Sequence, residues 1–128
     1  MKPKILVVSA NYYEKISFNL KLYASGILDK KTKYKFISVP GVFEIPVVIS
    51  KNIKKYDAFI ALGCVIKGET PHFDFISSAS THAIMNLSVV SKKPIGNGII
   101  TCLNMKQAKA RRKKGEEAAQ AIISVLSQ

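Results

Sequence analysis

Hydrophobic and polar residues recur along the chain with two different periods, which together predict a series of strands and helices. Four short runs rich in β-branched and aromatic residues have the composition of buried strands. These strands are expected at Lys4 to Ser9, Tyr34 to Val39, Tyr56 to Ile66 and Ile95 to Leu103. Elsewhere apolar residues follow helical spacing. Helices are expected from Glu14 to the lysines at Lys30 and Lys31, from Val42 to Ile53, from Phe73 to Val90, and from Lys106 to Leu126 with a break at Gly115.

Strands that alternate with helices predict a parallel sheet with helices on both faces. The expected fold class is therefore a three-layer α/β fold with four parallel strands. A length of 128 residues with 48% hydrophobic content fits one domain spanning residues 1–128. No apolar run reaches the ~18 residues that a membrane span needs, and the N-terminal segment lacks the pattern of a signal peptide. We expect a cytoplasmic protein.

The cysteines and the charged residues limit the kinds of site that the chain can form. Cys64 and Cys102 each lie in an apolar run without another Cys or His at ligand spacing, so both are expected to be small buried residues rather than metal ligands or disulfide partners. The formal charge of +12 raises nucleic acid as an alternative partner, which would be bound with steep salt dependence. The lysines are spread over the whole chain, however, which favours a solvated surface. Arg111 and Arg112 are the only arginines, and their planar forks suit phosphate or carboxylate.

The stretch from Ala61 to Ile76 reads as a buried strand, a tight turn and the start of a helix. Free N–H groups at a helix start bind anions, so Glu69 and Thr70 are candidates to hold a phosphate. His72 follows them, and its ordinary pKa of ~6.5 lets it exchange protons at neutral pH. The sequence shows no paired Ser or Cys nucleophile, no metal-ligand cluster and no Gly-rich dinucleotide fingerprint. We expect proton-transfer chemistry on a small phosphorylated substrate, without a metal or cofactor.

Two other strand ends carry suggestive residues. Tyr12 follows the first strand, and Glu44 lies between Phe43 and Ile45 after the second. Glu44 has two interpretations: a first-turn carboxylate that suits the helix N-terminus, or an acceptor for a hydroxylated ligand. Because the carboxyl ends of parallel strands meet at one end of a sheet, these residues and the turn before His72 are expected to share one cleft.

Three segments carry a family resemblance. The segments VPGVFEIP, ALGCVIKGETPHFD and IGNGIITCLNMKQAKAR resemble, in the same order, the signatures of the 6,7-dimethyl-8-ribityllumazine synthase family, and the likeness runs from about Lys4 to Leu126. The resemblance implies a flavodoxin-like fold in rings of five subunits with active sites between neighbours. It also implies the condensation of 5-amino-6-(D-ribitylamino)uracil with 3,4-dihydroxy-2-butanone 4-phosphate, which releases phosphate and water in the penultimate step of riboflavin biosynthesis.

The resemblance also implies roles for single residues. His72 falls on the proton-transfer histidine, Glu69 and Thr70 fall on the phosphate loop, and Glu44 falls on the carboxylate that receives the ribityl hydroxyls. Arg111 falls on the arginine that reaches the phosphate from the neighbouring subunit, assisted by Lys114. The remaining positions that line the pyrimidine and ribityl pocket are Tyr12 (or Asn11 or Tyr13), Val42, Phe43, Cys64, Val65 and Ile66.

Some positions depart from the family pattern. Asn97 stands where many members have Phe, so a polar contact would replace stacking on the substrate. The connection from Arg111 to Lys114 and the segment before the first strand are both short, which predicts a free pentamer or a decamer rather than a sixty-subunit shell. A flavin- or lumazine-binding protein without turnover is the alternative. The presence of both His72 and Arg111 favours the enzyme.

Overall fold

The computed structural model describes residues 2–68 and 72–128, and within them the backbone forms one parallel sheet. Its strands are β1 (Lys4–Ala10), β2 (Lys33–Val39), β3 (Ala58–Ile66) and β4 (Ile95–Cys102). They lie in the order β2-β1-β3-β4. The four predicted strands are confirmed, with β3 beginning at Ala58 rather than Tyr56 and β4 ending at Cys102 rather than Leu103. This order is that of the flavodoxin-like folds, whose ligands bind where the strand order reverses, between β1 and β3.

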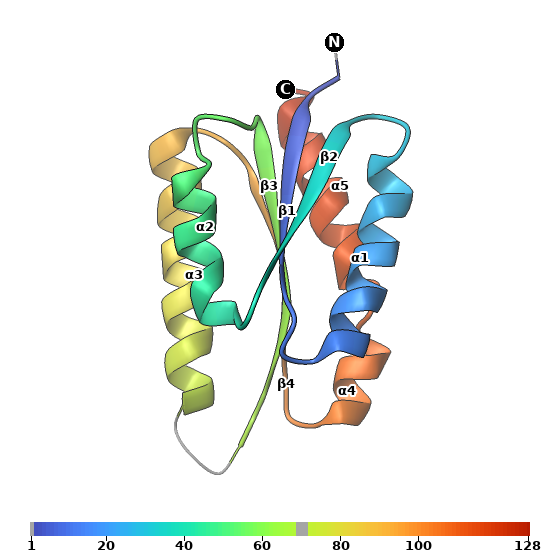
Figure 1. Ribbon diagram of the computed structural model, residues 1–128, viewed down its shortest axis with the longest axis vertical. Helices are drawn as coiled ribbons and strands as arrows, with labels where there is room; N and C mark the ends of the chain where they lie inside the picture. The colour runs from blue at the N-terminus through green and yellow to red at the C-terminus, as the bar shows by residue number, and fades with distance from the viewer. Residues whose placement is uncertain (1, 69–71) are drawn as a thin grey trace.

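Helices cover both faces of the sheet (Figure 1). The described helical segments are α1 (Glu14–Leu28), the 3₁₀ turn η1 (Val42–Glu44), α2 (Ile45–Lys51), α3 (His72–Ser91), α4 (Met105–Ala110) and α5 (Lys114–Leu126). Helices α2 and α3 lie on one face, and α1, α4 and α5 lie on the other (Figure 1). The predicted three-layer α/β fold is confirmed. None of the helices in the part of the chain that the structure describes is long and apolar enough to cross a membrane.

The last helical region corrects the sequence prediction. The break expected at Gly115 lies earlier, at residues 111–113, and Gly115 is buried inside α5. A Cβ atom on Gly115 would lie 2.1 Å from the carbonyl oxygen of Leu20 in α1. The glycine therefore permits close contact between two helices rather than ending one. The helix expected from Val42 to Ile53 is also shorter, because it divides into η1 and α2 and ends at Lys51.

Two hydrophobic clusters, one on each face, hold the layers together. Successive side chains of a strand point to opposite faces, so β1 sends Ile5 and Val7 toward α1 and α5 and sends Leu6 and Val8 toward α2 and α3. Cys64 and Cys102 are buried with free thiols, as the sequence predicts. Because β1 and β3 are buried on both faces, the sheet is a firm platform for the loops at its carboxyl end.

Candidate functional site

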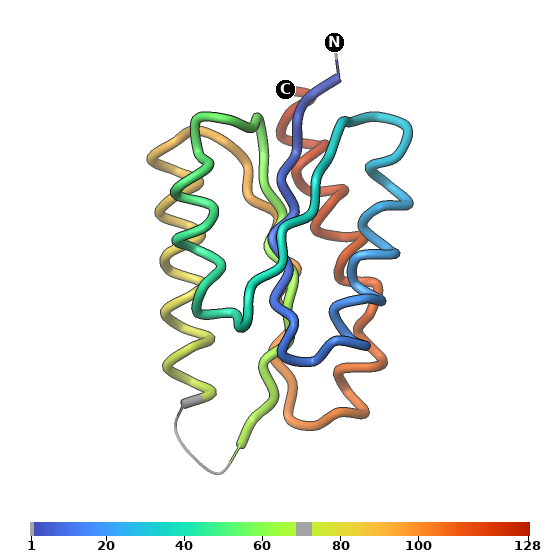
Figure 2. Tube along the Cα trace, viewed as in Figure 1, coloured from blue at the N-terminus to red at the C-terminus, as the bar shows by residue number. Residues whose placement is uncertain are grey.

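The carboxyl ends of β1, β2 and β3 point away from the two termini (Figure 2). They surround a cavity of about 640 Å³. The residues that line it are Tyr12, Tyr13, Gly41, Val42, Phe43, Glu44, Cys64, Val65, Ile66, Gly68, Phe73 and Ile76. Its volume is within the roughly 300–1,000 Å³ of small-molecule sites. The described parts of the three loops after these strands share one cleft as expected, whereas residues 69–71 of the turn before His72 lie outside the described residues.

The turn after β1 brings two aromatic rings to the cavity. Tyr12 and Tyr13 meet edge to face with their ring centroids 4.9 Å apart. Ser17 in α1 secures both sides of this turn, because its hydroxyl donates to the carbonyl of Ala10 and its N–H donates to the carbonyl of Tyr13. Burial, and next the neighbouring Tyr12, raises the pKa of Tyr13. The Tyr12 side chain is 75% exposed, so its ring offers a surface on which a planar ligand can stack.

The turn after β2 places a carboxylate in the cavity wall. The N–H of Glu44 donates to the carbonyl of Gly41 at 3.2 Å, which closes the 3₁₀ turn. The carboxylate lies close above Gly41, since a Cβ there would be 3.2 Å from Glu44 Oε1. Glu44 stands at the N-cap of α2, where its charge suits the helix dipole, but its side chain makes no capping hydrogen bond. Its oxygens are therefore available to a ligand in the cavity.

The end of β3 forms the floor. Burial, and then the neighbouring Cys102, raises the pKa of the Cys64 thiol to about 12. The thiol therefore stays protonated at neutral pH and is not a nucleophile. Gly63 lets the 3₁₀ turn lie directly on the strand, because a Cβ there would be 2.8 Å from Val42 Cγ2.

The first turns of α3 close the cavity on one side with Phe73 and Ile76. The backbone of His72 begins this helix, whereas its side chain is not among the described features. Glu69 and Thr70, the predicted phosphate loop, also lie outside the described residues. The sequence interpretation did not name Phe73 or Ile76 as lining residues. Their i, i+3 spacing at the start of a helix was the available signal.

Three predicted site residues do not line the cavity of their own chain. Asn97 lies exposed in β4, where its Oδ1 accepts a hydrogen bond from the N–H of Ile99 at 3.0 Å. Arg111 follows α4 and donates from Nη1 to the carbonyl of Thr101 at 2.9 Å. Lys114 begins α5. These three residues can contact a ligand only in the matching cavity of another subunit, unless the chain rearranges.

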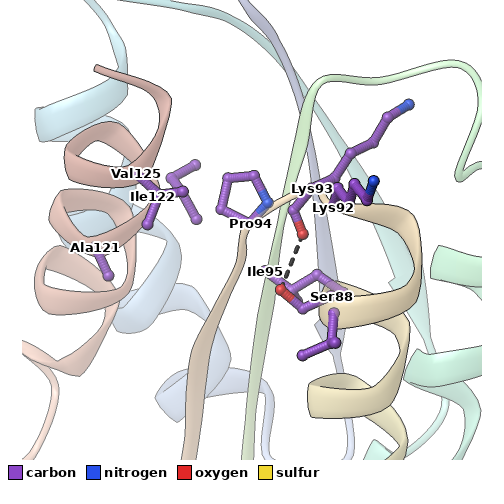
Figure 3. Close-up of a pocket in the computed structure, with 9 residues that line it drawn as sticks. Ser88, Lys92, Lys93, Pro94, Ile95, Ala121, Ile122 and Val125 are labelled. Atoms are coloured by element: carbon purple, nitrogen blue, oxygen red, sulfur yellow. Dashed lines mark hydrogen bonds between the residues drawn. The ribbon is translucent and has the colours of Figure 1, made fainter. Parts of the chain in front are cut away.

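A second hollow of about 330 Å³ lies between the end of α3 and α5 (Figure 3). Its lining residues are Ser88, Val89, Lys92, Lys93, Pro94, Ile95, Ala121, Ile122 and Val125. The Ser88 hydroxyl donates to the carbonyl of Lys93 at 2.9 Å, and Lys93 Nζ donates to the carbonyl of Ile53 at 2.6 Å. These polar groups already have partners, so the hollow is a weaker candidate. Within residues 2–68 and 72–128, no three His, Cys, Asp or Glu side chains gather as a metal site.

Comparison with known proteins points to a single family. Residues 2–128 match the family described as 6,7-dimethyl-8-ribityllumazine synthase. A protein of that name from Bartonella bacilliformis is 44% identical over 122 residues, covering 91% of this chain and 80% of that protein. Another from Bartonella tribocorum is 43% identical, covering 98% and 89%. One from Agrobacterium fabrum is 40% identical, covering 98% and 93%.

Proposed function

This chain belongs to the 6,7-dimethyl-8-ribityllumazine synthase family, and we propose that it is a transferase that forms this lumazine in riboflavin biosynthesis. The substrates are 5-amino-6-(D-ribitylamino)uracil and 3,4-dihydroxy-2-butanone 4-phosphate, which condense with loss of phosphate and water. The observation that carries the proposal is one cavity lined by the turns after β1 and β2, the end of β3 and the start of α3. Its lining includes aromatic rings, a carboxylate and apolar side chains, which suits a planar ligand that carries hydroxyl groups.

The pyrimidine and its ribityl chain occupy the part of the cavity nearest β1 and β2. The exposed ring of Tyr12 stacks on the pyrimidine. Glu44 accepts hydrogen bonds from the ribityl hydroxyls, because an ionised carboxylate can only accept and a hydroxyl can donate. The residues Val42, Phe43, Cys64, Val65 and Ile66 line the remaining walls. The protonated Cys64 thiol contributes shape rather than chemistry.

The butanone phosphate occupies the part nearest α3. Gly68 and Phe73, which flank the predicted phosphate loop, both line the cavity, and this supports a role for the N–H groups of Glu69 and Thr70. The N-terminus of the 20-residue helix α3 adds a favourable dipole for an anion. In the proposed site Arg111 of a neighbouring subunit completes the phosphate contacts, and Lys114 assists it.

His72 is proposed to move protons in two steps. When the pyrimidine amine attacks the ketone and forms an imine, the imidazole carries the two amine protons in turn to the carbonyl oxygen, which leaves as water. It then removes a carbon-bound proton as phosphate departs. General acid–base catalysis of this kind contributes about 10² to 10⁴ in rate, whereas holding two reactants together can contribute more. Orientation by the cavity is therefore the larger part of the mechanism.

The site needs more than one subunit in this proposal, and the surface is consistent with that. The side chains of Val47, Met85, Val89 and Val90 on α2 and α3 are between 56% and 73% exposed although they are apolar. Where exposed apolar side chains gather on one face, a partner normally covers them. We propose a homopentamer, or a decamer formed from two pentamers, with Arg111 crossing to the next cavity. Sedimentation of the purified protein measures the state, and a monomer that retains full activity would contradict it.

Turnover of the two substrates, followed by lumazine absorbance, tests the function. His72→Ala is expected to lower kcat by about 10², because the general acid–base is lost. The matched control is His82→Ala, which removes the exposed histidine in the middle of α3. Arg111→Ala is expected to raise KM for the butanone phosphate, with Arg112→Ala as its control. A folded wild-type protein that binds lumazine but never forms it would instead establish the binding protein without turnover.

A further inference from the structure

Two hydrogen bonds that share Gln107 join the end of β4 to the start of α4. Asn104 Oδ1 accepts from the N–H of Gln107 at 2.9 Å, and Gln107 Oε1 accepts from the N–H of Leu103 at 2.8 Å. The first N–H groups of a helix have no partner within the helix, so caps of this kind decide how the chain enters it. Here the cap joins the end of the sheet to the first turn of α4 at two points.

Gln107 also contacts the residue that follows α4. The N–H of Arg111 lies 3.2 Å from the carbonyls of both Gln107 and Ala108. Helix α4 has only six residues, and a helix of this length is not stable in isolation. Its position depends on the burial of Ala108 in the core and on the cap. Gln107 therefore has two contacts: its side chain binds the N–H of Leu103, and its carbonyl binds the N–H of Arg111.

The Arg111 side chain returns to the sheet. Nη1 donates to the carbonyl of Thr101 at 2.9 Å and lies 3.9 Å from Cys102 Sγ. A guanidinium carries five N–H donors in a rigid fork, and this contact anchors one of its nitrogens. Bidentate binding of a phosphate requires the plane of the fork to be fixed. The anchors of Arg111 at Thr101 and at Gln107 therefore determine what the rest of the fork can reach.

We propose that Gln107 is a positioning residue for the arginine that binds the substrate phosphate. This inference rests on the proposed function, in which Arg111 contacts the butanone phosphate. Loss of the Gln107 acceptor leaves the N–H of Leu103 without its partner and frees α4 to shift against the sheet. Arg111 then spends less time in the pose that meets the phosphate, while the pyrimidine subsite is unaffected.

Kinetics of Gln107→Met test the inference, because methionine has similar length but does not replace the amide acceptor. We expect KM for the butanone phosphate to rise roughly fivefold to tenfold, the scale of one lost hydrogen bond. We expect kcat, and KM for the pyrimidine, to stay within about twofold of wild type. The lost contact holds only the phosphate substrate, and it holds that substrate equally in the ground state and the transition state. The control is Gln120→Met on the exposed side of α5. If Gln107→Met does not fold, Asn104→Ala removes the other half of the cap and carries the same expectation.

A double-mutant cycle separates positioning from a general structural role. In the Arg111→Ala background, Gln107→Met should add nothing to KM, because the residue it positions is gone. The inference is wrong if the double variant raises KM by the product of the two single effects. It is also wrong if Arg111→Ala raises KM for the butanone phosphate and Gln107→Met leaves it unchanged. If Arg111→Ala itself leaves KM unchanged, it is the phosphate role of Arg111 in the proposed function that fails.

Discussion

Gly63→Ala tests how the cavity wall is held on the sheet. In β3, a Cβ atom at this position would lie 2.8 Å from Val42 Cγ2, 3.2 Å from Ala10 Cβ and 3.8 Å from Ile45 Cδ1. Ordinary contact begins at 3.4 Å, so the Val42 methyl must retreat by about 0.6 Å. Val42 is buried and belongs to the 3₁₀ turn that carries Glu44, so the wall has to move with it.

The size of the effect follows from overpacking. One inserted methyl group in a close-packed site costs about 1–3 kcal/mol of unfolding free energy. Catalysis should suffer as well, because a displacement of about 1 Å in a positioning element can cost about 10² in rate. For the smaller movement here we expect kcat/KM for the pyrimidine substrate to fall roughly tenfold.

Urea unfolding at one fixed protein concentration measures the stability, since an oligomer gains stability with concentration. The matched control is Gly26→Ala in α1, where a Cβ would meet nothing within 4 Å. Alanine is the better helix former, so this control should gain about 0.5–1 kcal/mol. The same chemical change thus has opposite expected signs at the two positions. If Gly63→Ala unfolds at the wild-type urea concentration with unchanged kinetics, the turn is not held by this contact and the reasoning is wrong.

Three further variants follow from the geometry. Gly115→Ala should cost about 3 kcal/mol or more in urea unfolding, because its Cβ would lie 2.1 Å from the backbone oxygen of Leu20, which cannot rotate away; a stable variant would contradict this. Glu44→Gln should raise KM for the ribityl pyrimidine about tenfold while KM for the butanone phosphate stays unchanged, and equal effects on both would refute the assignment. For Cys64, with a pKa raised from 9.0 to about 12, the unfolded chain releases the thiol proton first above about pH 9. Folding stability should therefore fall as pH rises from about 9 to about 12, and Cys64→Ala should lessen that fall; identical pH profiles of unfolding would rule it out.

The fold class could be predicted from the sequence because the strand-like runs and the segments with helical spacing do not overlap. Runs such as Ala61 to Ile66 contain only apolar or small residues, which is typical of a strand buried on both faces. The same logic predicted that the loops containing Tyr12 and Glu44 share a cavity, since parallel strands end together. The strand order is different, because right-handed connections alone leave more than one order open; the flavodoxin-like order was implied only by the family resemblance.

Gly115 shows where such reasoning stops. A glycine within a helical pattern is compatible with a helix end or with a close contact, and only the position of Leu20 in another helix decides between them. Asn97 is a similar case. The family resemblance implied a contact between Asn97 and substrate; Oδ1 of Asn97 accepts from the N–H of Ile99 in its own chain, and the substrate contact stays a prediction. Local patterns do not contain the identity of a partner that is distant in sequence or that comes from another subunit.

The hydrogen bonds of β4 have a consequence for solubility. The carbonyls of Pro94 and Cys102 accept N–H groups from Phe59 and Lys67 on the β3 side. Backbone groups of a strand alternate in direction, so the odd-numbered residues between them turn their N–H and C=O toward the outer rim of the sheet. An outer strand with such unpaired groups is a template for aggregation.

Two of those outward groups are already taken by side chains of the same chain. Asn97 covers the N–H of Ile99, and Arg111 covers the carbonyl of Thr101. A foreign strand would have to displace an amide and a guanidinium before it could pair there. At these two positions the rim of β4 is thus protected against fibril-like extension.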